Sequence, residues 1–152
     1  MSGGGFSDAQ RTALTAVLDA LVPRSADGRL PGAGEIGLAS GIEEQLGAMC
    51  AFTAPGLDAL DARARERGAS GFAALGAAER ADVMNAHAAA DPGFLPGLVF
   101  QVYSAYYQHP RVLSGLGLEP RPPHPKGYAV EQPDLDALLA PVRARTKLYR
   151  DV

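Results

Sequence analysis

Three histidines have the broadest catalytic repertoire of the side chains in this sequence, because imidazole exchanges protons near neutral pH and also binds metals. They are His87, His109 and His124. None stands in an HExxH motif or at the spacing of a zinc site. Each also has a structural interpretation. His87 packs on an alanine-rich helix, His109 caps the C-terminus of a helix as a cation, and His124 makes a surface contact from a proline-rich segment.

The other signatures of catalysis are missing from the sequence. It contains no GxSxG, no P-loop and no GxGxxG that follows a strand. The carboxylates of Glu43 and Glu44 point about 100° apart on a helix, so they do not form an acid–base pair. Cys50, the one cysteine, fits a small core residue. We therefore predict no catalytic residue, no cofactor-binding residue and no metal ligand in this chain.

Composition points to a helical domain. The chain has 152 residues, of which 47% are hydrophobic and 20% charged, and much of the hydrophobic share is alanine. We predict an all-α fold, a compact single-domain bundle of about five to six helices. A leader is expected at 1–6, the helical core at 7–118, a proline-rich extended strap at 119–133, and a C-terminal helix with a basic end at 134–152. Within the core, Ser7 begins the first helix through a capping box and Pro55 opens the third.

Charge and hydropathy limit the partners and the cellular compartments that we expect for this chain. A net charge of −3 provides no field for nucleic acid, and no apolar run approaches the roughly 20 residues of a membrane span. The start of the sequence has neither the basic nor the apolar region of a signal peptide. As written, the chain is expected in the cytoplasm. Removal of a leader, or export with a partner, would place it in the periplasm.

The segment 91–110 is the most unusual helix of the chain, because its apolar residues form two stripes. One stripe consists of Leu95, Leu98, Val102 and Tyr106. The other consists of Phe100, Tyr103 and Tyr107. A helix that is apolar around most of its circumference is normally covered around most of it. Two interpretations are open: this is the central helix of the bundle, or its aromatic side meets another chain.

We expect a partner-binding surface in two parts. Aromatic side chains and a pre-extended proline segment bury much area while losing little conformational freedom, so they make good anchors. The helix supplies Tyr103, Tyr106, Tyr107 and His109. The strap supplies Pro123, His124, Pro125 and Tyr128.

Five segments, in this order and spacing, resemble the gluconate 2-dehydrogenase small-subunit family. They are ALTAVLDALVP at 13–23, LPGAGEIGLASGIEEQL at 30–46, GLDALDARARERG at 56–68, YYQHP at 106–110, and PKGY at 125–128. The resemblance implies a non-catalytic small subunit that binds and stabilises a large FAD-dependent dehydrogenase of the glucose–methanol–choline type. That partner would hold the FAD and oxidise a sugar, polyol or glycoside. In many such complexes a cytochrome c accepts the electrons.

The resemblance further implies an export role, since the family's small subunits often carry a twin-arginine leader that this sequence does not show. Two other classes of function compete with the accessory role. One is a self-contained helical ligand-binding protein or enzyme that uses His87 or His109. The other is a structural protein that buries its aromatic face against its own copy.

Overall fold

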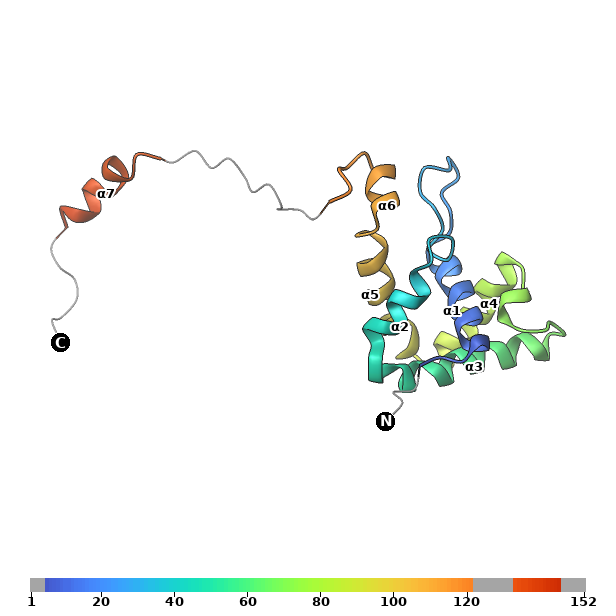
Figure 1. Cartoon of the computed structure of the whole chain (residues 1–152). Helices are drawn as coiled ribbons and strands as arrows, with labels where there is room; N and C mark the ends of the chain where they lie inside the picture. Colours follow the sequence, from blue (N-terminus) through green and yellow to red (C-terminus); the bar gives the residue numbers. More distant parts are fainter. Residues whose placement is uncertain (1–4, 122–132, 146–152) are drawn as a thin grey trace, which may run out of the picture. The chain divides into compact units, whose positions relative to one another are not determined.

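The computed structural model of the chain describes residues 5–121 and 133–145, and every regular element in these ranges is a helix (Figure 1). The elements, in chain order, are α1 (Asp8–Leu21), α2 (Leu38–Leu46), the 3-10 helix η1 (Gly47–Met49), α3 (Cys50–Glu66), the 3-10 helix η2 (Phe72–Ala74), α4 (Ala77–Ala90), α5 (Phe94–Tyr106), α6 (Pro110–Gly115) and α7 (Leu135–Arg143). The predicted all-α fold is confirmed. No helix in these ranges has the length and apolar character needed to cross a membrane.

The centre of the bundle is α1, which packs against α2, α3, α4 and η2. It begins as predicted, with the Ser7 hydroxyl accepting the Gln10 backbone N–H at 3.2 Å and the Gln10 side chain accepting the Ser7 N–H at 2.9 Å. Its residues Leu14, Val17 and Leu18 are fully buried. The interpretation of α5 as the central helix is therefore wrong, since α5 packs chiefly on α2.

Helix α3 begins earlier than the sequence indicates. Pro55 was expected in the first turn, but α3 starts at Cys50 because η1 leads the chain directly into it, and Pro55 lies inside the helix. The next residue, Gly56, touches the ring of Phe94 so closely that a Cβ at this position would overlap that ring. The missing side chain lets α3 pack directly against the start of α5.

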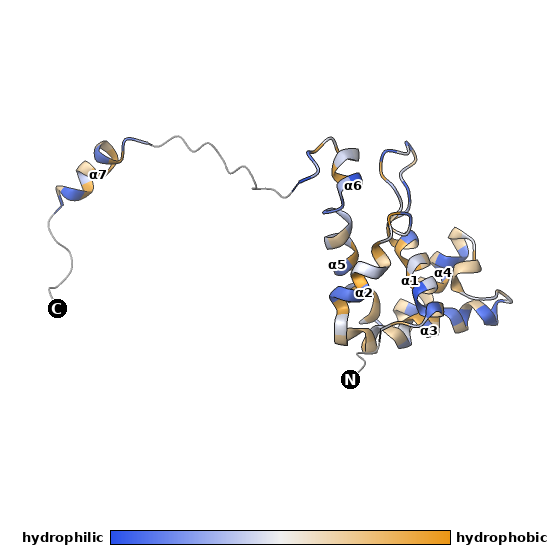
Figure 2. Ribbon diagram, viewed as in Figure 1, coloured by the Kyte–Doolittle hydropathy of each residue, from blue (hydrophilic) through white to orange (hydrophobic). Residues whose placement is uncertain are grey.

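The described residues fall into two units, one ending at Arg121 and one containing α7. The predicted start of the last helix is confirmed, since the Asp134 carboxylate caps α7 by accepting two backbone N–H groups at 3.1 Å. Both hydrophobic and hydrophilic residues occur on α7 (Figure 2). Its four large apolar side chains are all exposed within the described residues, and they are Leu135, Leu138, Leu139 and Val142. Most of the predicted strap lies outside the described residues.

Candidate partner-binding surface

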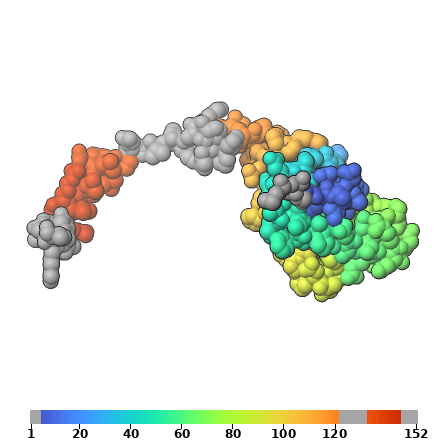
Figure 3. Space-filling view, turned by 60° about the horizontal axis from the view of Figure 1, so that its bottom comes forward, coloured from blue at the N-terminus to red at the C-terminus, as the bar shows by residue number. Residues whose placement is uncertain are grey.

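The two apolar stripes of α5 differ in burial. Leu98, Val102 and Tyr106 are buried, as the first stripe requires. The second stripe is exposed: Phe100 retains 69% of its surface, Tyr103 46% and Tyr107 50%. We call these three residues the aromatic face. Part of the surface of α5 and α6 is visible in the space-filling view (Figure 3). Of the two interpretations of this helix, the exposed aromatic face favours the one in which it meets another chain.

Ring contacts orient two of the three residues of this face, Tyr103 and Tyr107. The rings of Tyr103 and Tyr107 lie 6.0 Å apart at a 51° tilt. Tyr107 also meets the buried ring of Tyr106 edge-on, with the centroids 5.2 Å apart and the planes at 88°. Edge contacts of this kind are favourable and orient the ring. Tyr107 is thus half-exposed yet supported from below, so it would lose little conformational freedom on binding.

Tyr106 does not belong to this surface, which corrects one of the expected contact residues. It is 1% exposed, and its hydroxyl donates a 2.7 Å hydrogen bond to the backbone carbonyl of Pro31. The reason is the pitch of the helix. Adjacent residues point about 100° apart, so Tyr106 and Tyr107 cannot face the same way. Tyr106 attaches the end of α5 to the loop after α1.

His109 also has a role different from the expected one. We predicted a cation at the C-terminus of the aromatic helix, but His109 is the N-cap of α6. Its Nδ1 accepts the backbone N–H of Arg111 at 3.3 Å, so the ring serves as a hydrogen-bond acceptor. The α5 helix ends before it, at Tyr106, and Pro110 then starts α6 at a position where proline is favoured. His109 is half-buried at this junction.

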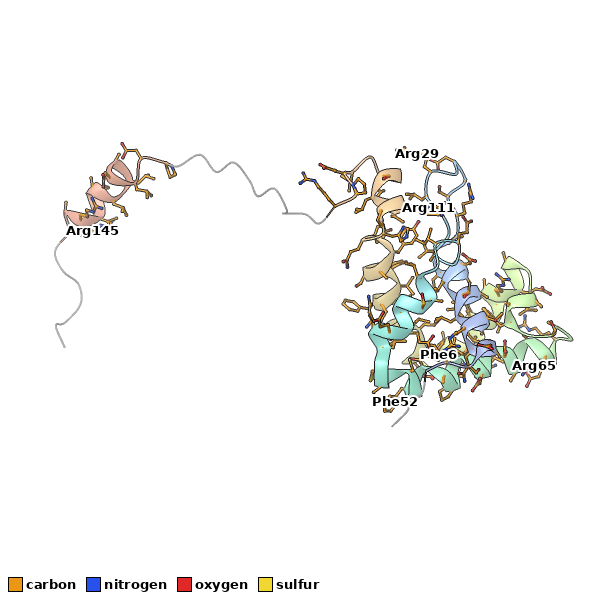
Figure 4. The ribbon with its side chains drawn as sticks, viewed as in Figure 1. Phe6, Arg29, Phe52, Arg65, Arg111 and Arg145 are labelled. Carbon is orange, nitrogen blue, oxygen red and sulfur yellow. The ribbon has the colours of Figure 1, made fainter. Side chains whose placement is uncertain are left out.

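The other expected contact residues, Pro123, His124, Pro125 and Tyr128, lie outside the described residues. The structure adds a second apolar surface that sequence reasoning missed. It is a groove of about 340 Å³ whose lining includes Met49, Phe52, Gly97 and Gln101. Phe52 is 76% exposed beside it (Figure 4). Because Pro55 was expected to open the third helix, Phe52 was not expected to lie within it, where it is exposed.

His87, the candidate for an internal catalytic site, is packed in the first unit. It is 4% exposed, and its ring meets Phe94 edge-on at 5.0 Å. Neither of its nitrogens has a hydrogen-bond partner within the described residues. Across the same residues, no group of three His, Cys, Asp or Glu side chains is placed to hold a metal. Within the described residues, neither ring nitrogen of His87 is hydrogen-bonded to a nucleophile, a base or an orienting acid, as a catalytic constellation would require.

Burial lowers the pKa of the His87 imidazole below its usual 6.5, with Asp91 opposing the shift and Arg63 adding to it. The unfolded chain thus binds this proton more tightly than the native one. We expect His87 to contribute to stability above pH 6.5, and this contribution to fall as the pH decreases below that value. One proton gives a slope of at most about 1.4 kcal/mol per pH unit.

Urea unfolding of the parent and of His87→Leu between neutral pH and pH 5 checks this expectation. The variant should show a flatter dependence on pH, while the contribution of the carboxylates stays common to both proteins. Equal slopes for the two proteins would contradict a buried, uncharged His87.

Comparison with known proteins assigns the chain to a family. Among proteins of curated function and among solved structures, none matches it significantly. Residues 8–118 match the gluconate 2-dehydrogenase subunit 3 family, and this range includes α1 through α6. The match covers most of the chain and the whole of the aromatic face. The chain belongs to the gluconate 2-dehydrogenase subunit 3 family.

Proposed function

We propose that this chain is a non-catalytic accessory subunit that binds and stabilises an FAD-dependent dehydrogenase of the glucose–methanol–choline type. The observation that carries the proposal is the aromatic face, three large exposed side chains on α5 and its C-cap, in a protein that belongs to a dehydrogenase subunit family. Aromatic residues, tyrosine above all, are enriched in the central contacts of protein interfaces. The family membership supports the choice of a dehydrogenase as the partner.

The chemistry of the complex is assigned to the partner. A dinucleotide such as FAD is usually held where a strand turns into a helix. The described residues contain no strand and so no such turn, which supports placing the flavin on the partner. We place the FAD, and the oxidation of a sugar, polyol or glycoside, on the catalytic subunit. The electrons then pass to a separate acceptor such as a cytochrome c.

The role of this chain is thermodynamic. A subunit that binds only the native form of its partner shifts the partner's folding equilibrium by mass action, by about 2.7 kcal/mol when the free subunit is at a hundred times its dissociation constant. Burying the aromatic face would supply part of that binding energy. We expect the catalytic subunit to retain its flavin and its solubility better when this chain is present.

Co-expression tests the proposal. The chain carries an affinity tag and is produced with and without a candidate FAD-dependent dehydrogenase subunit of the same organism. The eluate is analysed by mass and by visible spectrum. A co-eluting protein of several times its mass with flavin absorbance supports the accessory role. A colourless chain that elutes alone contradicts that role. If the chain elutes alone, its size in solution distinguishes the two competing functions. A dimer would favour the structural homo-oligomer, and a monomer would favour a self-contained ligand-binding protein or enzyme that uses His87 or His109.

A further inference from the structure

An open pocket of about 540 Å³ lies where the loop between α1 and α2 meets α6. It is lined by Arg29, Pro110, Arg111, Ser114 and Gly115. Arg29 and Arg111 lie at the same end of the first unit (Figure 4). Two arginines and one serine therefore line a single exposed cavity. Guanidinium and hydroxyl groups are hydrogen-bond donors suited to an anion.

The loop that carries Arg29 has a fixed backbone. Ser25 accepts the Leu30 N–H on its hydroxyl at 2.9 Å and donates its own N–H to the Leu30 carbonyl at 3.0 Å. Asp27 accepts the backbone N–H of Arg29 at 3.0 Å and the Ser25 hydroxyl at 2.6 Å. The turn closes at Gly28, whose φ of 72° is in the left-handed region that glycine adopts without strain. Arg29 thus projects from a turn that is already ordered.

Helix α6 forms the other side of the pocket, and it packs closely against the loop that carries Arg29. A Cβ added to Gly115 would lie 2.5 Å from the backbone oxygen of Arg29, so only glycine lets α6 rest directly on this loop. Arg111 stands four residues before Gly115, one helical turn along the same side of α6. The packing that brings Gly115 onto the loop therefore also brings Arg111 beside Arg29.

Within the described part of the first unit, neither pocket arginine is held by an ion pair, although the Ser25 hydroxyl, the Arg29 backbone N–H and the charge of Arg29 all help to lower the pKa of the Asp27 carboxylate. Among the described residues of this unit, ion pairs join Arg11 to Asp8 and Glu43, Arg24 to Glu35, Arg65 to Asp61 and Arg121 to Glu119. No ion pair there involves Arg29 or Arg111. The carboxylate of Asp27 is engaged by a hydroxyl and a backbone N–H, as described above. The pocket therefore presents two guanidinium groups to whatever approaches it.

We propose that this pocket binds the side-chain carboxylates of an acidic segment on the partner dehydrogenase subunit. The inference rests on the proposed function and extends it by naming what the partner presents. Arginine binds carboxylates through paired hydrogen bonds, and two of them select a segment with more than one acid. The pocket and the aromatic face are close in the sequence, since Pro110 follows Tyr107 by three positions.

The shape of the pocket favours a macromolecule over a free ion. Arg29, Arg111 and Ser114 are all exposed, so a small anion bound here would remain largely hydrated and its attraction to the arginines would be screened. A protein segment would cover the arginines and exclude that water from the pocket. Inorganic phosphate is the small-anion competitor in the test.

The test compares two double variants with the same change in charge. Arg29→Gln with Arg111→Gln removes the pocket cations. Arg65→Gln with Arg67→Gln removes two arginines at the C-terminal end of α3, and Arg65 lies far from Arg29 and Arg111 (Figure 4). Circular dichroism first verifies that both fold. Calorimetry at low salt then measures the binding of a hexaglutamate peptide and of inorganic phosphate, and a pull-down titration measures binding to the flavoprotein.

The pocket variant should lose about tenfold in affinity for both the peptide and the flavoprotein, and the α3 variant should stay close to the parent. Equal losses in the two variants would overturn the pocket as a specific site. Phosphate binding without peptide binding would overturn it in favour of a small anion. An unchanged affinity of the pocket variant for the flavoprotein overturns this inference alone. Failure of the parent chain to bind the flavoprotein overturns the proposed function as well.

Discussion

Replacing Tyr106 by alanine should lower the free energy of unfolding by about 3–5 kcal/mol, the usual cost of removing a large aromatic side chain from a core. The ring is 1% exposed, and its hydroxyl makes a hydrogen bond that spans 75 positions of the sequence, so the loss combines a cavity with an unpaired Pro31 carbonyl. Tyr106→Phe keeps the ring and removes only the hydrogen bond to Pro31, so it should lower the free energy of unfolding by about 1 kcal/mol.

Tyr107→Ala is the matched control for this loss. Its side chain is half-exposed, so we expect a change of about 1 kcal/mol or less. Urea unfolding followed by circular dichroism measures all three variants. Similar losses at positions 106 and 107 would mean that α5 is rotated from the orientation described above.

The double variant Tyr103→Ala with Tyr107→Ala should retain the parent's helicity while binding the flavoprotein about a hundredfold more weakly. Each anchor of this kind contributes about 1.4–2 kcal/mol when it is truncated, and each 1.4 kcal/mol is tenfold in affinity. The two rings touch one another, so the losses will not be strictly additive. A pull-down titration against the flavoprotein measures the change.

Phe52→Ala provides the control for this second prediction. It also removes an exposed aromatic side chain, but from the groove beside η1 rather than from the aromatic face. We expect the partner to bind this variant as it binds the parent. The reverse pattern, in which Phe52→Ala weakens binding and the tyrosine variant does not, would move the interface to the groove.

The helical class and much of the detail of α1 could be predicted from the sequence, because they depend on local signals. The Ser7 capping box and the apolar spacing of α1 need only neighbouring residues. The exposure of α5 could not be predicted in this way. Its two stripes are visible in the sequence, but which of them is covered depends on how many other helices reach it, and that is a property of the packed bundle.

The errors at the candidate surface have the same origin. Tyr106 and Tyr107 are chemically identical neighbours, and only the rotation between them decides that one holds a loop and the other faces outward. His109 follows one helix and precedes another, and a proline next to it is compatible with ending the first or starting the second. Sequence alone gives the residue types for such positions, and packing chooses among the roles.

The hydrogen bond from Tyr106 to Pro31 has a consequence for how a complex would assemble. It joins the last residue of α5, directly before Tyr107, to the loop that carries Arg29, two positions before Pro31. The aromatic face and the arginine pocket therefore lie on segments that are linked to each other. A partner that has engaged one patch then meets the other at a fixed spacing. If both proposals hold, the second contact would form at a high effective concentration without a further loss of rotational freedom, and two modest patches would act as a single bivalent surface.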